Sequence, residues 1–495
     1  MNAFSGSPEA AARRQEIVAA LRAVLPAGAL LCDEEETRPY ECDGLAVYRR
    51  LPMAVALPAT ETEVGAVLKA CPPLWGPIVP RGAGTGLSGG AMPISEGVVL
   101  STARLNRIVS VDPRSRTAVV QPGVRNLAIS EAAAPHGLYY APDPSSQIAC
   151  TIGGNVAENS GGVHCLKYGL TVHNVLRVRM VTSAGEAVEL GGMAPDAPGL
   201  DLLAVFIGSE GMLGVVTEVT VKLVPKPQAA RVIMAPSDDV ATGGNAVASA
   251  IPAGIIPAGL EMMDRTSSRM VEPFVRAGYD TDAAAILLCE SDGVPEEVDD
   301  EIARMTEVLR QAGASAIAVS QSEAERLKFW SGRKNAFPAA GRISPDYYCM
   351  DGTIPRKNLA EVLLRIERME GKYGLRCANV FHAGDGNLHP LILFDANQPG
   401  EFERAEAFGA DILELCVEMG GTITGEHGVG IEKINSMCVQ FAPQEREAFF
   451  ALKRAFDPAF LLNPDKAIPT LARCAEYGKM HVRRGELKFP DLPRF

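Results

Sequence analysis

The sequence predicts an α+β protein with more than one domain, and three observations support this prediction. The chain has 495 residues, more than one hydrophobic core usually serves, so two or three domains are expected. Runs rich in β-branched residues, at residues 175–181 and 215–221, predict strands. Longer segments, at residues 296–312 and 443–456, predict helices between the strands.

Changes in sequence character along the chain predict four segments. Residues 1–50 are expected to form a helical lead-in, and residues 51–227 a first α+β domain. Residues 228–420 are expected to form a second domain, and residues 421–495 a C-terminal segment that returns to the first domain. Within the first domain, Thr60 and Glu63 have the spacing of a capping box and predict the start of a helix.

Composition narrows the possible partners. The net charge of −13 argues against nucleic acid, which requires clustered Lys and Arg. The eleven cysteines include no C-x-x-C pair, so neither an iron–sulfur cluster nor a zinc ribbon is expected, and a reducing compartment is favoured. Ser7-Pro8-Glu9 predicts the start of a helix, so a signal peptide is not expected. No run of apolar residues reaches the 18 residues that a membrane-spanning helix needs. A cytoplasmic protein without a transmembrane segment is therefore expected.

Three of the seven histidines lie in two short segments near the C-terminus. Asp385-Gly386 favours a two-residue type I′ turn, which would place His382 directly opposite His389 on an antiparallel hairpin. Two imidazoles in this arrangement can share a metal ion. Glu426-His427, in a glycine-rich loop, could add a carboxylate ligand and a base. The alternatives are a packed hairpin with satisfied histidines and a structural zinc site, which usually has four protein ligands.

Three clusters of Gly, Ser and Asn alternate with strands in the first domain. They lie at residues 81–90, 142–162 and 208–214. The first cluster matches Gly-x-Gly-x-x-Gly, but Pro93 and a strand follow it instead of a helix, so a Rossmann-type NAD site is disfavoured. Converging backbone amides in such loops can bind an anion. The three loops together indicate a large, elongated, polar ligand, such as a dinucleotide.

The three loops, in this order, resemble the FAD-binding domain of the vanillyl-alcohol oxidase (PCMH-type) superfamily. The hairpin and the Glu-His loop resemble its D-2-hydroxyacid dehydrogenase branch. Residues 333–338, 347–351, 456–458, 461–464 and 489–490 are similar to the FAD-containing subunit of bacterial glycolate oxidases. The resemblance covers about residues 40–470. It implies a first domain in which two α/β subdomains bind FAD. It also implies a second α+β domain, which is built on an antiparallel sheet and caps the substrate, and a C-terminal helical segment.

The resemblance also implies site residues. The metal ligands of the family match His382, His389 and Glu426, and the metal would be zinc or, alternatively, manganese or iron. The catalytic base of the family matches His427. The arginine that binds the substrate carboxylate matches Arg333. Thr85 replaces a histidine that attaches FAD covalently in some members, so FAD should be non-covalent. The residues expected to bind FAD are Arg81, Gly82, Ala83, Gly84, Thr85, Gly86, Leu87, Gly89, Gly90, Pro142, Asp143, Ser145, Ser146, Gly153, Gly154, Asn155, Asn159, Ser160, Gly161, Gly162, Gly211, Gly214, Val215 and Asn463.

One departure bears on the substrate. Cys349 stands where 2-hydroxyglutarate enzymes have a lysine, which favours a small acid: glycolate oxidised to glyoxylate, or D-lactate oxidised to pyruvate. Arg342 is a second candidate for binding the carboxylate. Expected partners are an iron–sulfur subunit and a second FAD-domain subunit, in a complex at the inner membrane. The alternatives are a D-2-hydroxyacid dehydrogenase acting alone, an oxygen-using oxidase, and a non-catalytic flavoprotein subunit.

Overall fold

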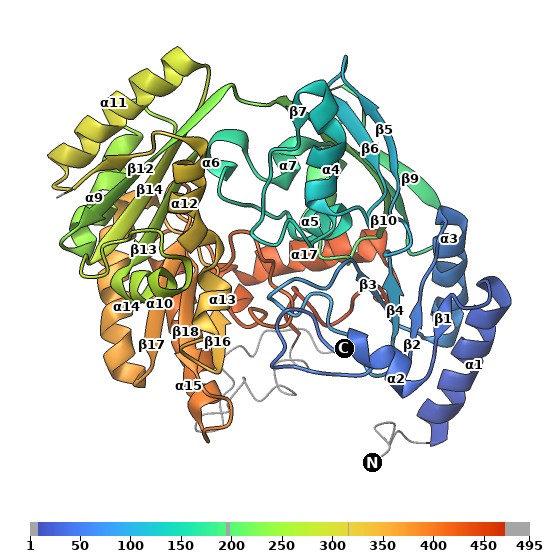
Figure 1. The fold of residues 1–495 in the computed structure, drawn as a ribbon. Coiled ribbons are helices and arrows are strands. Elements are labelled where there is room, and N and C mark those ends of the chain that lie inside the picture. Colours follow the sequence, from blue (N-terminus) through green and yellow to red (C-terminus); the bar gives the residue numbers. More distant parts are fainter. Residues whose placement is uncertain (1–7, 195–198, 315, 471–495) are drawn as a thin grey trace. The chain divides into compact units, whose positions relative to one another are not determined.

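The computed structural model describes residues 8–194, 199–314 and 316–470, and it divides the chain into two compact units (Figure 1). The first unit comprises Met1–Ser160, Leu170–Pro225 and Glu426–Phe495. The second comprises Gly161–Gly169 and Lys226–Gly425. The chain therefore leaves the first unit twice and returns to it for its C-terminal part.

The first sheet of the first unit has four strands in the order β1-β2-β4-β3. They are β1 (Leu30–Leu31), β2 (Ala54–Ala56), β4 (Val98–Ser101) and β3 (Ile78–Arg81), and β4 runs parallel to both β2 and β3. Helices α1 (Pro8–Val24) and α3 (Glu61–Ala70) contribute buried residues to the same core as these strands. The Thr60 side chain accepts a hydrogen bond from the Glu63 amide, which confirms the predicted helix start.

The second sheet of the first unit is antiparallel, in the order β5-β6-β10-β8-β9. Its strands are Ile108–Asp112, Thr117–Val120, Val215–Lys222, Val175–Val181 and Ala187–Gly191, and β7 (Leu138–Tyr139) pairs separately with β11 (Val224–Pro225). The remaining α-helices of this unit are α2 (Glu34–Thr37), α4 (Asn126–Ala133), α5 (Ile152–Glu158), α7 (Thr171–Asn174), α8 (Leu202–Phe206), α16 (Met437–Gln440) and α17 (Pro443–Phe456). The predicted strand at 175–181 and helix at 443–456 are confirmed.

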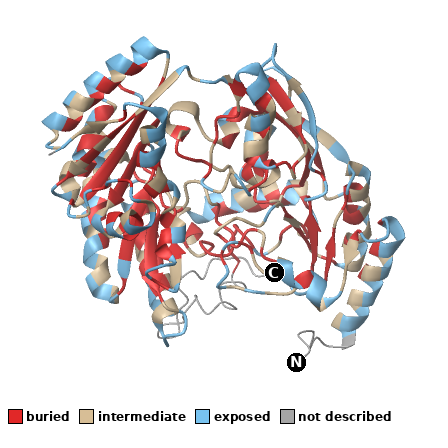
Figure 2. Cartoon of the chain, in the orientation of Figure 1, coloured by how far each residue is buried: buried red, intermediate tan, exposed pale blue. Residues whose placement is uncertain are grey.

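The second unit is built on a seven-stranded antiparallel sheet, in the order β15-β12-β14-β13-β17-β18-β16. The strands are Ala318–Val319, Ala229–Ser237, Ala285–Gly293, Gly259–Asp264, Arg376–Phe381, Pro390–Phe394 and Asp346–Cys349. The helices are α6 (Cys165–Tyr168), α9 (Val240–Ala250), α10 (Arg265–Val275), α11 (Pro295–Gln311), α12 (Glu323–Lys334), α13 (Ala336–Ala340), α14 (Leu359–Tyr373) and α15 (Glu401–Glu418). Figure 2 shows the central strands almost wholly buried. The α+β class and the antiparallel sheet expected of the second domain are confirmed.

One predicted loop is a helix. Gly153, Gly154 and Asn155 were expected in a loop but belong to α5, which begins just after Thr151. Glycine disfavours helices, yet here it permits close packing, because a Cβ on Gly153 would lie 2.6 Å from the Cβ of Pro122. Tertiary packing therefore overrides local propensity. Separately, no helix in the described part of the chain is long and apolar enough to cross a membrane.

Candidate functional site

The first glycine cluster forms a loop between β3 and β4, as predicted, with no helix opening at its end. Arg81 lies beneath this loop, where its Nη1 donates to the Cys42 carbonyl at 2.7 Å. A Cβ on Gly84, whose φ is +73°, would lie 2.1 Å from Arg81 Nη2. The buried guanidinium therefore sets the path of the loop, and only glycine fits above it.

The loop offers a row of amide donors. From Ala83 to Gly90, no backbone amide donates a hydrogen bond to any residue that the structure describes. Backbone amides that are not used within the fold need another acceptor, and consecutive glycine-rich amides bind phosphate oxygens well. This part of the chain therefore fits the diphosphate of a dinucleotide.

Two residues near the C-terminus hold the end of the loop. Asn463 Nδ2 donates to the carbonyl of Gly90 at 2.9 Å and to that of Glu210 at 2.6 Å. Lys466 Nζ donates to the carbonyls of Gly90 and Met92, at 2.9 and 2.6 Å. Asn463 was expected to bind FAD, and here it joins two of the predicted loops. Lys466 was missed, because nothing in its local sequence marks it as buried.

The other expected FAD-binding residues fall in separate segments. Those at 142–146 lie between β7 and α5, and Asn126 Nδ2 donates to the Pro142 carbonyl at 3.1 Å. Asn159 ends α5 with a left-handed φ of 55° and accepts a hydrogen bond from the Val172 amide. Val215 is the first residue of β10, and Gly214 directly precedes it. Gly161 and Gly162 belong to the second unit.

The loop that carries His427 is built onto the first glycine loop. Ser88 Oγ donates to the His427 carbonyl at 2.9 Å, and the Ser88 carbonyl accepts from the amides of Ile431 and Glu432. Glu210 holds the other side of this loop, since its two carboxylate oxygens accept from the amides of Val429 and Gly430, each at 2.7 Å. His427 thus sits in a segment fixed by two of the three predicted glycine loops.

Two acidic side chains beneath this loop have perturbed pKa values. Burial raises the pKa of Glu210, although its hydrogen bonds from Val429 and Gly430 act in the opposite direction. Burial and the neighbouring charge of Glu210 raise the pKa of Glu158 well above its ordinary value. The Oε2 atom of Glu158 makes no hydrogen bond within the described chain. Sequence reasoning missed both acids, because their burial depends on tertiary packing.

In the second unit, the predicted hairpin exists but its register was wrong. The amide of His382 donates to the Asn387 carbonyl at 3.1 Å, so His382 pairs with Asn387 and not with His389. The turn has four residues, and of these only Gly386 has positive φ, whereas a type I′ turn needs two such residues. Contacts from outside the hairpin hold the turn, since Arg356 Nη1 donates to the Gly384 carbonyl at 2.9 Å.

The register shift still brings the two imidazoles together. His389 is now the diagonal neighbour of His382 across the hairpin, on the same face, within reach of long side chains. The ring centroids lie 5.0 Å apart, with an interplanar angle of 86°. Both residues are 3% exposed.

Arg333 and His382 meet at one buried carboxylate. Glu261, on β13, accepts from Arg333 Nε at 2.5 Å through Oε2, and its Oε1 lies 2.6 Å from His382 Nδ1. Burial raises the pKa of Glu261, but the charges and hydrogen bonds of His382 and Arg333 outweigh it and hold the pKa below its usual range. Arg333 Nη2 makes no hydrogen bond with the described residues. The alternative arginine, Arg342, is exposed and lies over the ring of Phe274.

Asp351 fixes the segment that leads to Glu426 and His427. Its Oδ2 accepts from Thr424 Oγ1 at 2.6 Å, and its backbone carbonyl accepts from the Gly425 amide at 2.8 Å. Its Oδ1 lies 4.0 Å from His389 Nδ1. Sequence reasoning did not recognise the Asp351 carboxylate as part of the site.

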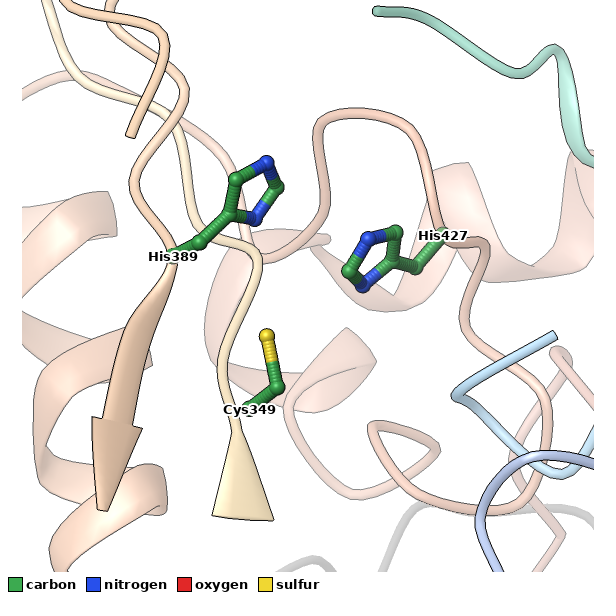
Figure 3. Close-up of side chains that lie close together, drawn as sticks. All are labelled: Cys349, His389 and His427. Atoms are coloured by element: carbon green, nitrogen blue, oxygen red, sulfur yellow. The ribbon is translucent and has the colours of Figure 1, made fainter. Parts of the chain in front are cut away.

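The resulting group of side chains has the chemistry of a metal site. Ligand atoms of Asp351, His389, Glu426 and His427 all lie within 4.8 Å of one another. Figure 3 shows His389 and His427 close together, with Cys349 beside them, and these three form a second such group. Nitrogen and carboxylate oxygen ligands suit Zn²⁺. His382, a predicted ligand, is outside both groups, and its Nδ1 contacts Glu261.

Comparisons with known proteins agree with both units. Residues 52–191 match the family model described as "FAD binding domain", and residues 226–467 match "FAD linked oxidases, C-terminal domain". The chain is similar to p-cresol methylhydroxylase (TM-score 0.77, 19% identity, 92% of this chain and 96% of that one). It is also similar to 4-ethylphenol oxidase from Gulosibacter chungangensis (TM-score 0.78, 17% identity, 94% and 98%).

The chain therefore belongs to the FAD-linked oxidases, with a PCMH-type fold, and is an FAD-dependent oxidoreductase. Among its relatives, glycolate oxidase subunit GlcD of Escherichia coli K12 is 62% identical over 97% of each chain. GlcD of Bacillus subtilis is 39% identical, over 88% of this chain and 93% of the relative. A D-lactate dehydrogenase of Anaerostipes hadrus is 32% identical, over 91% and 97%.

Proposed function

We propose that this protein oxidises a small 2-hydroxy acid to the 2-oxo acid, glycolate to glyoxylate and also D-lactate to pyruvate. The proposal is supported by relatives whose names specify glycolate oxidase and D-lactate dehydrogenase. The observation that carries it is the group formed by Asp351, His389, Glu426 and His427, whose ligand atoms lie within 4.8 Å of one another. The buried Arg333, in the same unit as the hairpin, could bind the carboxylate of the substrate.

We propose His382, His389 and Glu426 as ligands of a divalent metal, with Asp351 beside them. The donor set of nitrogens and oxygens favours zinc, and manganese or iron are alternatives. When bound, such a metal lowers the pKa of a coordinated hydroxyl group. His382 fits this role, because its Nδ1 contacts a carboxylate, as is usual for a histidine that binds a metal through its other ring nitrogen.

The other residues bind the substrate and move its proton. Arg333 keeps its terminal nitrogens for a carboxylate, which a guanidinium binds through two charge-assisted hydrogen bonds. His427 accepts the hydroxyl proton, and a positioned base typically contributes about 10²–10⁴-fold to the rate. FAD, when bound, supplies the acceptor for the hydride that leaves the α-carbon. Thr85, in the glycine loop, leaves the flavin without a covalent bond at that position.

Cys349 sets the proposed preference for small acids. It is 6% exposed, and Figure 3 shows its side chain beside His389 and His427. A cysteine side chain offers no positive charge for a second carboxylate, and an unpaired charge is costly to bury. A 2-hydroxy dicarboxylate should therefore be a poor substrate.

Electrons would leave the flavin through a partner. The relatives named GlcD are subunits of a glycolate oxidase, and we propose a similar complex here. Its other members would be an iron–sulfur subunit and a second FAD-domain subunit, which would hold this cytoplasmic chain at the inner membrane. Activity without partners, as in a D-lactate dehydrogenase acting alone, is the alternative and is favoured only by the more distant relatives.

The test is flavin reduction without oxygen. The purified protein should show a flavin spectrum that bleaches with glycolate and with D-lactate, and far more slowly with D-2-hydroxyglutarate. A flavin that none of the three acids reduces would contradict the proposal. Fast reduction by D-2-hydroxyglutarate alone would reject the role of Cys349.

A further inference from the structure

Glu261 connects two residues that the proposed function uses separately. It lies on β13, is 1% exposed, and contacts His382 with one oxygen and Arg333 with the other. The partners are far apart in sequence, 121 and 72 residues away from it, and both are buried. One carboxylate therefore determines the orientation of both side chains.

The contact with His382 fixes which ring nitrogen carries the proton. A carboxylate can only accept, so Nδ1 of His382 must donate to Glu261 Oε1 across the 2.6 Å between them. In the neutral ring Nε2 is then the nitrogen without the proton, and this is the tautomer that binds a metal through Nε2. Carboxylate partners of this kind orient metal-binding histidines and raise their basicity.

The contact with Arg333 fixes the plane of the guanidinium. Glu261 holds Nε, at the inner edge of the group, and leaves the two terminal nitrogens for other partners. Nη2 is buried and makes no hydrogen bond within the described chain. Buried donors are nearly always paired, so a ligand acceptor is expected there. A carboxylate matches the fork of a guanidinium.

We propose that Glu261 is a positioning residue that serves the metal and the substrate at once. It holds His382 in the metal-binding tautomer and holds Arg333 in the orientation that binds the substrate carboxylate. This inference rests on the proposed function, which assigns those two roles. It adds that metal affinity and substrate affinity depend on the same carboxylate.

The second unit contains a matched control. Glu290, on the neighbouring strand β14, is 3% exposed and also bridges a histidine and an arginine. Its oxygens lie 3.2 Å from His164 Nε2 and 2.7 Å from Arg326 Nη1. Neither partner is among the metal ligands proposed above, whereas His382 is one of them. Glu290→Gln should therefore disturb a similar buried cluster without affecting the metal.

The experiment measures Zn²⁺ affinity of the purified, FAD-loaded full chain by competition with a chromophoric chelator. Glu261→Gln should bind Zn²⁺ about 10–100-fold more weakly than the wild type, because the amide can reverse the His382 tautomer. Its FAD content should be unchanged, and its KM for glycolate should rise. Glu290→Gln should bind Zn²⁺ like the wild type.

A second pair of variants covers the case in which Glu261→Gln leaves Arg333 without its counterion and fails to fold. Arg333→Met removes that charge, so the double variant Arg333→Met/Glu261→Gln is compared with Arg333→Met alone. The double variant should again bind Zn²⁺ about 10–100-fold more weakly. This comparison isolates the action of Glu261 on His382.

His382→Ala separates the two ways in which the inference can fail. If His382→Ala loses Zn²⁺ but removal of Glu261 changes the affinity less than twofold, the inference is wrong and the proposed metal site stands. If His382→Ala binds Zn²⁺ like the wild type, His382 is not a ligand, and the inference falls together with that part of the proposed function.

Discussion

Replacement of Glu210 by glutamine should loosen the loop that carries His427. The two oxygens of Glu210 accept separate hydrogen bonds from the amides of Val429 and Gly430, each at 2.7 Å. A glutamine keeps one acceptor oxygen and turns an NH₂ group toward the other amide. One buried hydrogen bond to a charged group is lost, which costs about 1.5–3 kcal/mol of unfolding free energy.

The same change should slow catalysis, because Val429 is two residues from His427. A displacement of a catalytic group by about 1 Å can reduce the rate about 10²-fold. Glu210→Gln should therefore lower kcat for glycolate at least tenfold with an unchanged KM and full FAD content. Denaturant unfolding and steady-state kinetics measure the two effects.

Glu218→Gln is the matched control for Glu210. Glu218 lies on β10, is 27% exposed and pairs with Arg177 at 2.9 Å. Surface ion pairs contribute about 0–1 kcal/mol, so this variant should remain close to the wild type in stability and kcat. A Glu210→Gln protein as stable and as active as Glu218→Gln would refute the proposed clamp on the His427 loop.

Three further predictions concern single side chains. His427→Ala should retain FAD and lose most turnover, about 10²–10⁴-fold, in single-turnover flavin reduction; unchanged rates would reject its role as base. Arg333→Lys should raise KM for glycolate about tenfold or more, since a lysine cannot form the forked pair, and an unchanged KM would contradict carboxylate binding there. Because the pKa of Glu158 is raised, the folded state keeps a proton that the unfolded state releases. The stability of the wild type should therefore fall as the pH rises from about 4.5 toward that raised pKa. Glu158→Gln should therefore raise the thermal midpoint more at pH 8 than at pH 5, and an equal change at both pH values would contradict this assignment.

Local signals predicted much of the fold. The strand at 175–181 and the helix at 443–456 were placed at their observed ends, because β-branched runs and an N-terminal proline act within the segment itself. The absence of a helix after the first glycine loop was also predictable, since Pro93 and Gly97 follow it. These features depend on neighbouring residues only.

Long-range contacts account for the failures. The hairpin register depends on Arg356 and on packing outside the hairpin, so the sequence preference of Asp385-Gly386 did not decide it. Gly153 allowed a helix where a loop was expected, through its contact with Pro122. Glu261 was missed because both of its partners are more than 70 residues away, and no local pattern distinguishes it from a surface glutamate.

Metal removal tests the central claim most directly. The protein would be freed of metal with a chelator, its FAD content verified, and flavin reduction by glycolate followed without oxygen in a stopped-flow instrument. The account predicts that reduction is lost in the metal-free protein and returns when Zn²⁺, Mn²⁺ or Fe²⁺ is added back. Reduction at the wild-type rate by a demonstrably metal-free protein would contradict it.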